Sequence, residues 1–223
     1  MGRNSAVLNQ FYRKMHSLLG PQFWWPGETP FEVIVGAILT QNTNWTNVEK
    51  AIANLKLADV LEPRKLLALE PSTLALLIRP AGFFNVKTKR LRAFLEWFVA
   101  RYEGRVEAMR NRPLAALREE LLGVKGIGRE TADSILLYAA GLPTFVVDAY
   151  TFRILRRHGL ITEDADYDEM KSLFEDNLER DRALFNEYHA LLVAVGKDHC
   201  KPRPVCKGCP LEWHPHVIEE RDP

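Results

Sequence analysis

The segment from residue 122 to residue 148 constrains this chain more than any other. It contains Gly126-Ile127-Gly128, a short glycine turn with a helical pattern on either side. Glycine admits the left-handed backbone that a tight turn needs, and its missing Cβ lets a partner approach closely. Backbone N–H groups at the start of the next helix suit a phosphate. We expect a hairpin that holds an anion, although a lone Gly-x-Gly is also typical of a simple helix cap.

An acidic residue follows the second helix of this segment. Asp148 comes after Pro143 and the apolar pair Val146-Val147, which predicts a fixed and sheltered position. Asp is a favoured N-cap, so the residue can simply begin the next helix. A fixed carboxylate can also stabilise positive charge that develops on a sugar. A phosphate site followed by a sheltered carboxylate indicates chemistry on a nucleic acid.

The composition suits a soluble globular protein. The chain has 223 residues, of which 47% are hydrophobic and 26% charged, enough for one large domain or two small ones. No apolar run approaches the roughly twenty residues of a membrane helix, and the first residues lack a secretion signal. We expect a cytoplasmic protein. The 30 Lys and Arg against 29 Asp and Glu argue against a strongly basic nucleic-acid binder, though not against one basic face.

Apolar residues recur at helical spacing almost throughout the chain, which predicts an all-α fold. Two β-like runs, 33–35 and 145–147, are too short to build a sheet. The predicted helices span residues 6–19, 31–40, 45–57, 87–102, 113–122, 129–140, 149–158, 167–178 and 182–196, with a short helix opening at Pro71.

The segment 122–148 resembles the helix-hairpin-helix and aspartate signature of the endonuclease III-like DNA glycosylases, and the resemblance extends from about residue 20 to about residue 213. It implies two helical lobes, one of residues 30–144 and one of residues 1–29 plus 145–223. Double-stranded DNA with a damaged base would lie in the cleft between the lobes of a monomer, in a bacterial or archaeal nucleoid. Asp148 would serve cleavage of the sugar–base bond. The hairpin residues that would grip the DNA are Lys125, Gly126, Gly128 and Arg129.

The residue after the hairpin separates two kinds of glycosylase. Bifunctional members of the family carry a lysine there, whose amine forms a Schiff base with the sugar. This chain has Glu130, which cannot form a Schiff base, and Lys125 lies before the glycine turn. Glu130 also fits an ordinary first-turn acid, favoured by the helix dipole. The missing amine predicts a monofunctional enzyme that uses water as nucleophile.

Tryptophans gather near the N-terminus in the string Phe23-Trp24-Trp25-Pro26, and Trp45 follows. An enzyme that acts on a base must extrude it and hold it between flat surfaces, and an indole also attracts a cationic base. The string resembles the Trp-Trp-Pro segment of the 3-methyladenine DNA glycosylase III group, which also has an aromatic at the place of Trp45 and a glutamate at the place of Glu130. We expect Trp24 and Trp45 to stack on the base, while Trp25 and Pro26 shape the pocket. The alternative is that the tryptophans pack in the core.

Two turns carry side chains that are candidates for filling the gap that a flipped base leaves in the duplex. The family inserts a polar side chain at the place of Gln41 and a second wedge at the place of Phe83. Filling the gap offsets part of the cost of unstacking. Gln41 can instead be an ordinary helix-end residue, and the phenylalanines can be core. Phe84 is an equal candidate for the wedge.

The three cysteines lie together near the C-terminus, as Cys200, Cys206 and Cys209. Such clustering in a cytoplasmic chain favours a metal over a disulfide. The spacing resembles the iron–sulfur loop of endonuclease III relatives, but the fourth cysteine is missing, because Pro215 stands near its place. A [4Fe–4S] cluster with another fourth ligand, a zinc ion and no metal all remain open. The candidate fourth ligands are His199, His214 and His216.

These features predict a base-excision DNA glycosylase that removes alkylated bases such as 3-methyladenine. One alternative is an endonuclease III-type glycosylase for oxidised or mismatched bases. The other is a non-catalytic helix-hairpin-helix module that only binds DNA. Asp148 and the tryptophans favour an enzyme, because a pure DNA binder needs neither.

Overall fold

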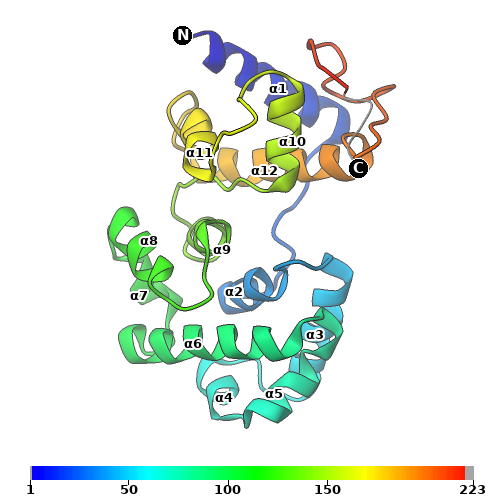
Figure 1. Ribbon diagram of the computed structural model, residues 1–223. Coiled ribbons are helices and arrows are strands. Elements are labelled where there is room, and N and C mark those ends of the chain that lie inside the picture. The colour runs from blue at the N-terminus through cyan, green and yellow to red at the C-terminus, as the bar shows by residue number, and fades with distance from the viewer. Residues whose placement is uncertain (1, 219–223) are drawn as a thin grey trace. The chain divides into compact units, whose positions relative to one another are not determined.

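The computed structural model describes residues 2–218, and within them the chain forms helices and loops without strands (Figure 1). The predicted all-α fold is therefore confirmed for this part of the chain. None of the described helices combines the length and the apolar character that crossing a bilayer requires.

The chain divides into two compact units. The central unit comprises Pro26–Leu142. The terminal unit combines residues up to Trp25 with residues from Pro143 onward. Each unit has a hydrophobic core of its own.

The central unit is built around the apolar helix α2 and the long helix α6. Helix α2 (Pro30–Leu39) begins with a proline. The side chain of Thr29 caps it by accepting from the backbone N–H of Glu32 at 3.1 Å. Helices α4 and α5 pack on one side of α6 and α2 on the other (Figure 1). Its helices are α2 (Pro30–Leu39), α3 (Trp45–Leu57), α4 (Pro63–Ala68), α5 (Pro71–Leu77), η1 (Arg79–Ala81), α6 (Phe84–Tyr102), α7 (Val106–Arg110), α8 (Leu114–Leu122), α9 (Arg129–Ser134) and the π-helical η2 (Ile135–Ala139).

The terminal unit packs α1 and α10 against α12. The close approach of α10 to α12 depends on Gly196, where a Cβ would lie 2.4 Å from Cδ1 of Tyr150. Any larger residue there would push the two helices apart. The helices are α1 (Arg3–Leu19), α10 (Ala149–Arg157), α11 (Tyr167–Glu175) and α12 (Arg182–Asp198).

Candidate nucleic-acid interface and active site

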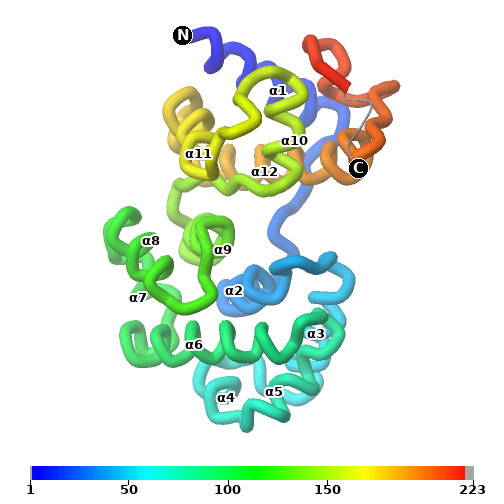
Figure 2. The backbone as a smooth tube through the Cα atoms, in the orientation of Figure 1, coloured from blue at the N-terminus to red at the C-terminus, as the bar shows by residue number. Residues whose placement is uncertain are grey.

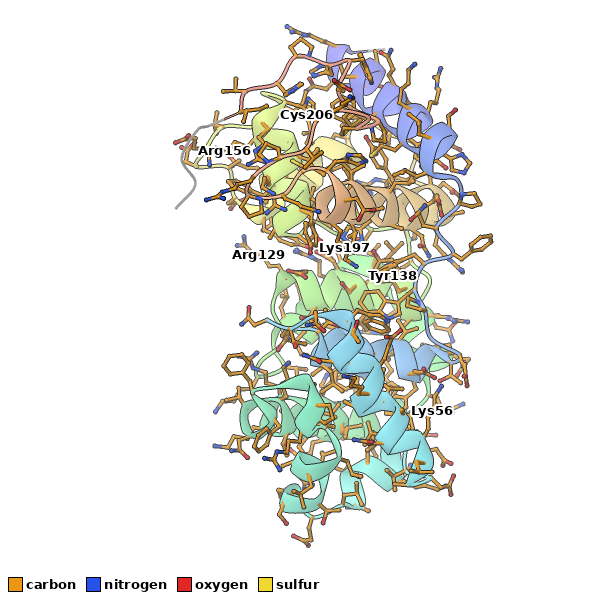
Figure 3. The ribbon with its side chains drawn as sticks, turned by 90° about the vertical axis from the view of Figure 1, so that its right-hand side faces the viewer. Lys56, Arg129, Tyr138, Arg156, Lys197 and Cys206 are labelled. Carbon is orange, nitrogen blue, oxygen red and sulfur yellow. The ribbon has the colours of Figure 1, made fainter. Side chains whose placement is uncertain are left out.

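The hairpin of the central unit joins α8 to α9 (Figure 2). Val124 and Ile127 anchor it in the core, and the N–H of Ile127 donates to the carbonyl of Val124 at 3.0 Å. Gly126 has φ +91°, so the predicted left-handed glycine is confirmed there, whereas Gly128 has φ −92° and precedes α9 without any side-chain cap. Lys125 and Arg129 are exposed on either side of the turn, and Figure 3 labels Arg129. Exposed cations beside an uncapped helix start can hold an anion.

In the terminal unit, Asp148 begins α10 and its two carboxylate oxygens have different partners. Oδ1 accepts from the backbone N–H of Thr151 at 2.8 Å and from its hydroxyl at 2.9 Å. Oδ2 lies 3.6 Å from Nε2 of His189. The side chain is 13% exposed. Burial alone would raise the pKa of Asp148, but the contacts with His189 and Thr151 outweigh it and hold the pKa below its usual range.

The segment leading to Asp148 is fixed by an acid on α11. Residues 144–147 are buried, and Oε1 of Glu175 accepts from the N–H of Phe145 at 2.8 Å and from the hydroxyl of Thr144 at 3.0 Å. Lys171 lies 3.3 Å from the same oxygen. The hydrogen bond from the N–H of Thr151 confirms that Asp148 is the N-cap of α10. Its carboxylate is therefore an anion held in one place. Such an anion can stabilise a developing cation without reorganising.

Sequence reasoning missed three residues that set the environment of Asp148: Thr151, Glu175 and His189. Only His189 left a signal, as a single imidazole within the apolar helix α12. Thr151 follows Asp148 by three residues, where a capped N–H ordinarily lies. Glu175 is an ordinary helix residue until the fold brings it to this segment.

Phe23, Trp24 and Trp25 lie in the terminal unit. The rings of Trp24 and Trp25 meet edge to face, with centroids 5.1 Å apart. The ammonium of Lys197, labelled in Figure 3, lies 5.9 Å from the ring centroid of Trp24, within the range of a cation–π contact. Nε1 of Trp24 is buried without a hydrogen-bond partner among the described residues. This indole therefore attracts a cation and has a donor to offer.

Trp45 belongs to the central unit, where it begins α3 directly after the cap Asn44. Its Nε1 donates to Oε1 of Glu49 at 2.8 Å. Because Trp24 and Trp45 lie in different units, the stacking pair stays a prediction. The same holds for Pro26, which is exposed where the central unit begins.

The two candidate wedge turns of the central unit carry unusual backbones. Phe83 has φ +46° and its side chain is 69% exposed, whereas Phe84 begins α6 and is half-buried. A left-handed backbone at a bulky residue costs on the order of 1–3 kcal/mol. Asn42, next to Gln41, has φ +53° and is also exposed. Strain of this kind, at exposed side chains, is typical of contact sites.

The cysteine loop packs on α10 through arginines. Arg157 donates to Sγ of Cys200 at 3.3 Å and to the carbonyls of Lys201 and Pro202 at 2.7 and 3.1 Å. Arg153 donates to the carbonyl of Cys200 at 2.6 Å.

The chain has three cysteines, one fewer than a four-thiolate cluster needs, so a metal in this loop stays a prediction. Burial, and then the neighbouring Cys200, raise the pKa of Cys206 and of Cys209. Within residues 2–218 no group of three or more His, Cys, Asp or Glu side chains is arranged to hold a metal. His199 and His216 line the same pocket as the cysteines, while His214 contacts the ring of His158.

Comparison with known proteins identifies the family of this chain. Residues 35–180 match the HhH-GPD superfamily of base excision DNA repair proteins. A protein of Methanocaldococcus jannaschii, described as a candidate DNA repair glycosylase, is 48% identical over 207 residues, or 92% of this chain and 94% of its own. Endonuclease III of Thermotoga maritima is 30% identical over 197 residues, or 86% of this chain and 85% of its own.

Solved structures give the same picture. The 3-methyladenine DNA glycosylase of H. pylori, bound to 1,N6-ethenoadenine, superposes with a TM-score of 0.75 at 33% identity, covering 87% of this chain and 97% of that one. A non-covalent endonuclease III–DNA complex has a TM-score of 0.79 at 21% identity, covering 95% and 94% of the two chains. The endonuclease III-like fold is thus shared, and DNA is the expected partner. The chain belongs to the HhH-GPD superfamily of base excision DNA repair glycosylases.

Proposed function

We propose that the protein is a monofunctional DNA glycosylase that hydrolyses the N-glycosidic bond of alkylated bases such as 3-methyladenine after flipping them from the duplex. The observation that carries the proposal is the carboxylate of Asp148, held ionised by Thr151 and His189. Loss of a base leaves positive charge on the sugar, and a fixed anion lowers the energy of that state. A base that already carries positive charge needs little help from an acid to depart.

The absence of lyase chemistry rests on the first turn of α9. Glu130 is exposed there, at the place where a Schiff-base lysine would stand, and a carboxylate cannot attack as an amine does. Borohydride added during turnover should therefore trap no covalent protein–DNA adduct. A strong trapped band on a denaturing gel would contradict the monofunctional assignment.

An alkylated purine as substrate is supported by the Trp24 indole. Its face already attracts the ammonium of Lys197, so it can attract a cationic base in the same way. The H. pylori 3-methyladenine DNA glycosylase, bound to 1,N6-ethenoadenine, is one of the similar structures. Trp24→Ala should slow release of cationic bases more than release of neutral ones, whereas Trp24→Phe should retain part of the stacking.

For the wedge we favour Phe83 over Phe84. An exposed phenylalanine on a left-handed backbone is costly to keep unless it contacts a partner. Phe83→Ala should weaken binding of duplex containing a damaged base about tenfold or more, since stacking is worth roughly 1–3 kcal/mol per base. Phe84→Leu is the matched control and should change this affinity little.

The experiment that tests the proposal is a base-release panel with the purified protein on matched duplexes. The duplexes carry 3-methyladenine, ethenoadenine, an oxidised pyrimidine or a mismatch. Release of the alkylated purines above all others supports the proposal. Preferred release of oxidised pyrimidines or mismatched bases would support the endonuclease III-type alternative, and binding without release would support the non-catalytic module.

A further inference from the structure

The long helix α6 carries a buried lysine. Lys87 is 1% exposed, and its ammonium donates to the carbonyl of Leu39 at 2.8 Å and to that of Ala81 at 2.7 Å. Burial, and then the nearby Arg90, lower the pKa of Lys87 to about 8, so the side chain is still mostly charged at neutral pH. A buried charge is costly unless it is hydrogen-bonded. The two bonds therefore have to form in the folded chain, and they fix two backbone segments to α6.

The first of these carbonyls belongs to the end of α2. Leu39 is the last residue of this helix, and the last carbonyls of a helix lack partners within it. The N–H of Thr43 donates to the carbonyl of Thr40 at 3.1 Å, while the ammonium of Lys87 supplies a donor to Leu39. A cation is also favoured at a helix C-terminus. Lys87 thus fixes the backbone just before Gln41.

The second carbonyl precedes the turn that carries Phe83. Gly82 and Phe83 both have left-handed backbones, with φ +69° and +46°. Lys87 holds this turn on both sides, because its ammonium donates to the carbonyl of Ala81 and its backbone N–H donates to that of Phe83 at 3.0 Å. One residue therefore fixes a turn whose backbone at Phe83 is costly to adopt.

The two segments occupy equivalent places relative to the lysine. Gln41 lies two residues after Leu39, and Phe83 lies two residues after Ala81. Two oxygens bonded to one nitrogen lie close together, so the chain after each carbonyl starts from neighbouring points. The two side chains that are candidates for filling the gap therefore depend on a single ammonium for their spacing.

The side chain of Gln41 has other partners in the free protein. Its Nε2 donates to the carbonyl of Gly126 at 3.1 Å and to the hydroxyl of Thr131 at 2.9 Å, and its Oε1 accepts from Nη1 of Arg90. An amide that enters a duplex gives up these bonds. The bonds of Lys87 are made to backbone carbonyls and can remain, so this lysine is the support of the turn that insertion does not remove.

We propose that Lys87 is a positioning residue that sets the spacing between the turns of Gln41 and Phe83, so that both side chains fill the duplex together when a base is flipped. The proposal rests on the proposed function and on the gap-filling roles predicted for these two residues. Lys87 is too deeply buried to reach DNA and acts through backbone carbonyls. Its loss should leave binding by the hairpin intact and impair the filling of the gap.

The first test compares Lys87→Met with Arg92→Met. Arg92 also lies on α6 and donates to two backbone carbonyls, those of Leu67 and Leu69 at 3.2 and 2.8 Å. They lie at the end of α4, which packs on the other side of α6 from α2 (Figure 1). Both variants should lower the melting temperature, since each leaves carbonyls without their donor. Both should bind undamaged duplex within about twofold of the parent, because the hairpin is unchanged.

The distinguishing measurement is base extrusion at saturating protein, at a temperature where every variant is folded. With 2-aminopurine beside the damaged base, the parent and Arg92→Met should give the fluorescence rise of an extruded base, and Lys87→Met should lose most of it. Single-turnover base release by Lys87→Met should fall about tenfold, because less of the unstacking cost is offset. Lys87→Arg, which keeps a charged donor, should recover part of both signals.

A second substrate separates positioning from general damage to the fold. A damaged base opposite an abasic site has no pairing partner to leave, so its extrusion costs less. The deficit of Lys87→Met should shrink markedly on this duplex, whereas a damaged active site would slow both substrates alike. If Lys87→Met does not fold, Lys87→Gln, uncharged and one atom shorter, enters the same comparison with Arg92→Gln as its control.

Equal fluorescence and equal base release by the Lys87 and Arg92 variants would overturn the proposal. An undiminished deficit opposite the abasic site would overturn it as well, because the lysine would then support the fold in general. A parent protein that neither binds duplex nor releases a damaged base would contradict the proposed function instead.

Discussion

Two helix starts of this protein solve the same problem in opposite ways. The first N–H groups of any helix lack partners within it. At α10 the chain supplies its own acceptor, the carboxylate of Asp148, while at α9 it supplies Gly128, which has no side chain to offer. A capped start fixes a carboxylate, and an uncapped start beside exposed Lys125 and Arg129 suits an anion from outside. Under the proposed function, the capped start of α10 serves the chemistry and the uncapped start of α9 binds the DNA backbone.

The variant Asp148→Asn should give the largest effect and tests the role of the capped start of α10. Asparagine caps a helix about as well as aspartate, so the melting temperature should hardly change. The fixed negative charge is lost, and base release should fall by about 10²–10³-fold. Single-turnover base release and thermal unfolding check the two halves of this expectation.

The matched control for that variant is Asp166→Asn. Asp166 caps α11 in the same manner, accepting from the N–H of Glu169 at 2.9 Å. It should leave base release at the parent rate. Equal rates for Asp148→Asn and the parent would show that Asp148 only caps its helix.

A second variant gives α9 the kind of side-chain cap that α10 has. Gly128→Asp places an acceptor at the start of α9, where a Cβ meets nothing within 4 Å. The protein should become more stable by about 0.3 kcal/mol, because glycine is itself a tolerated N-cap residue. Its affinity for duplex DNA should fall about tenfold with a shallower salt dependence, as measured by titration at several salt concentrations.

Gly128→Ala is the control for the added side chain, since it brings the Cβ without the acceptor. Its affinity for duplex DNA should fall less than that of Gly128→Asp. If Gly128→Asp binds no more weakly than Gly128→Ala, the start of α9 does not hold a phosphate.

A smaller effect is expected when Asp148 loses one of its partners. Thr151→Val removes the hydroxyl that donates to Oδ1 but keeps the backbone N–H bond and the shape of the side chain. A hydrogen bond to a charged group is worth about 1.5–3 kcal/mol, and the remaining bonds offset part of the loss. Base release should slow about three- to tenfold, and Thr151→Ser should recover most of the rate.

The smallest effect concerns stability and pH. The pKa of Asp148 is lower in the folded protein than in the unfolded chain, so between the two values the unfolded chain binds more protons. The free energy of unfolding should therefore gain a contribution from Asp148 that is present above the usual aspartate pKa and lost as the pH falls through the folded pKa. Urea unfolding of the parent and of Asp148→Asn across this acidic range measures the difference, and parallel curves would contradict the pKa shift.

Local patterns predicted most helices well. Trp45–Leu57 begins and ends where the pattern placed it, because Asn44 caps it and its apolar residues keep a helical period. The short helices α4 and α7 escaped notice, since six and five residues hold too little periodicity to be read. The predicted helix 129–140 becomes π-helical from Ile135 onward, which no local pattern indicated.

The same difference between local and long-range contacts applies to the candidate site. Asp148 and the glycine turn were visible because their chemistry depends on residue type and on neighbours in the sequence. The partners of Asp148 were not, since His189 and Glu175 reach it or its segment from helices far along the chain. The internal contacts of Gln41 were equally hidden, because they join it to Arg90 and Gly126, 49 and 85 positions away.

Residue order alone was enough to establish a helical chain, a glycine hairpin and a sheltered acid, because backbone freedom, helical periodicity and capping act over a few residues. The protonation of Asp148, the exposure of Phe83 and the inward contacts of Gln41 depended on the folded chain. Burial, electrostatic fields and hydrogen bonds between distant segments arise only when packing brings those segments together, and no short stretch of sequence contains them.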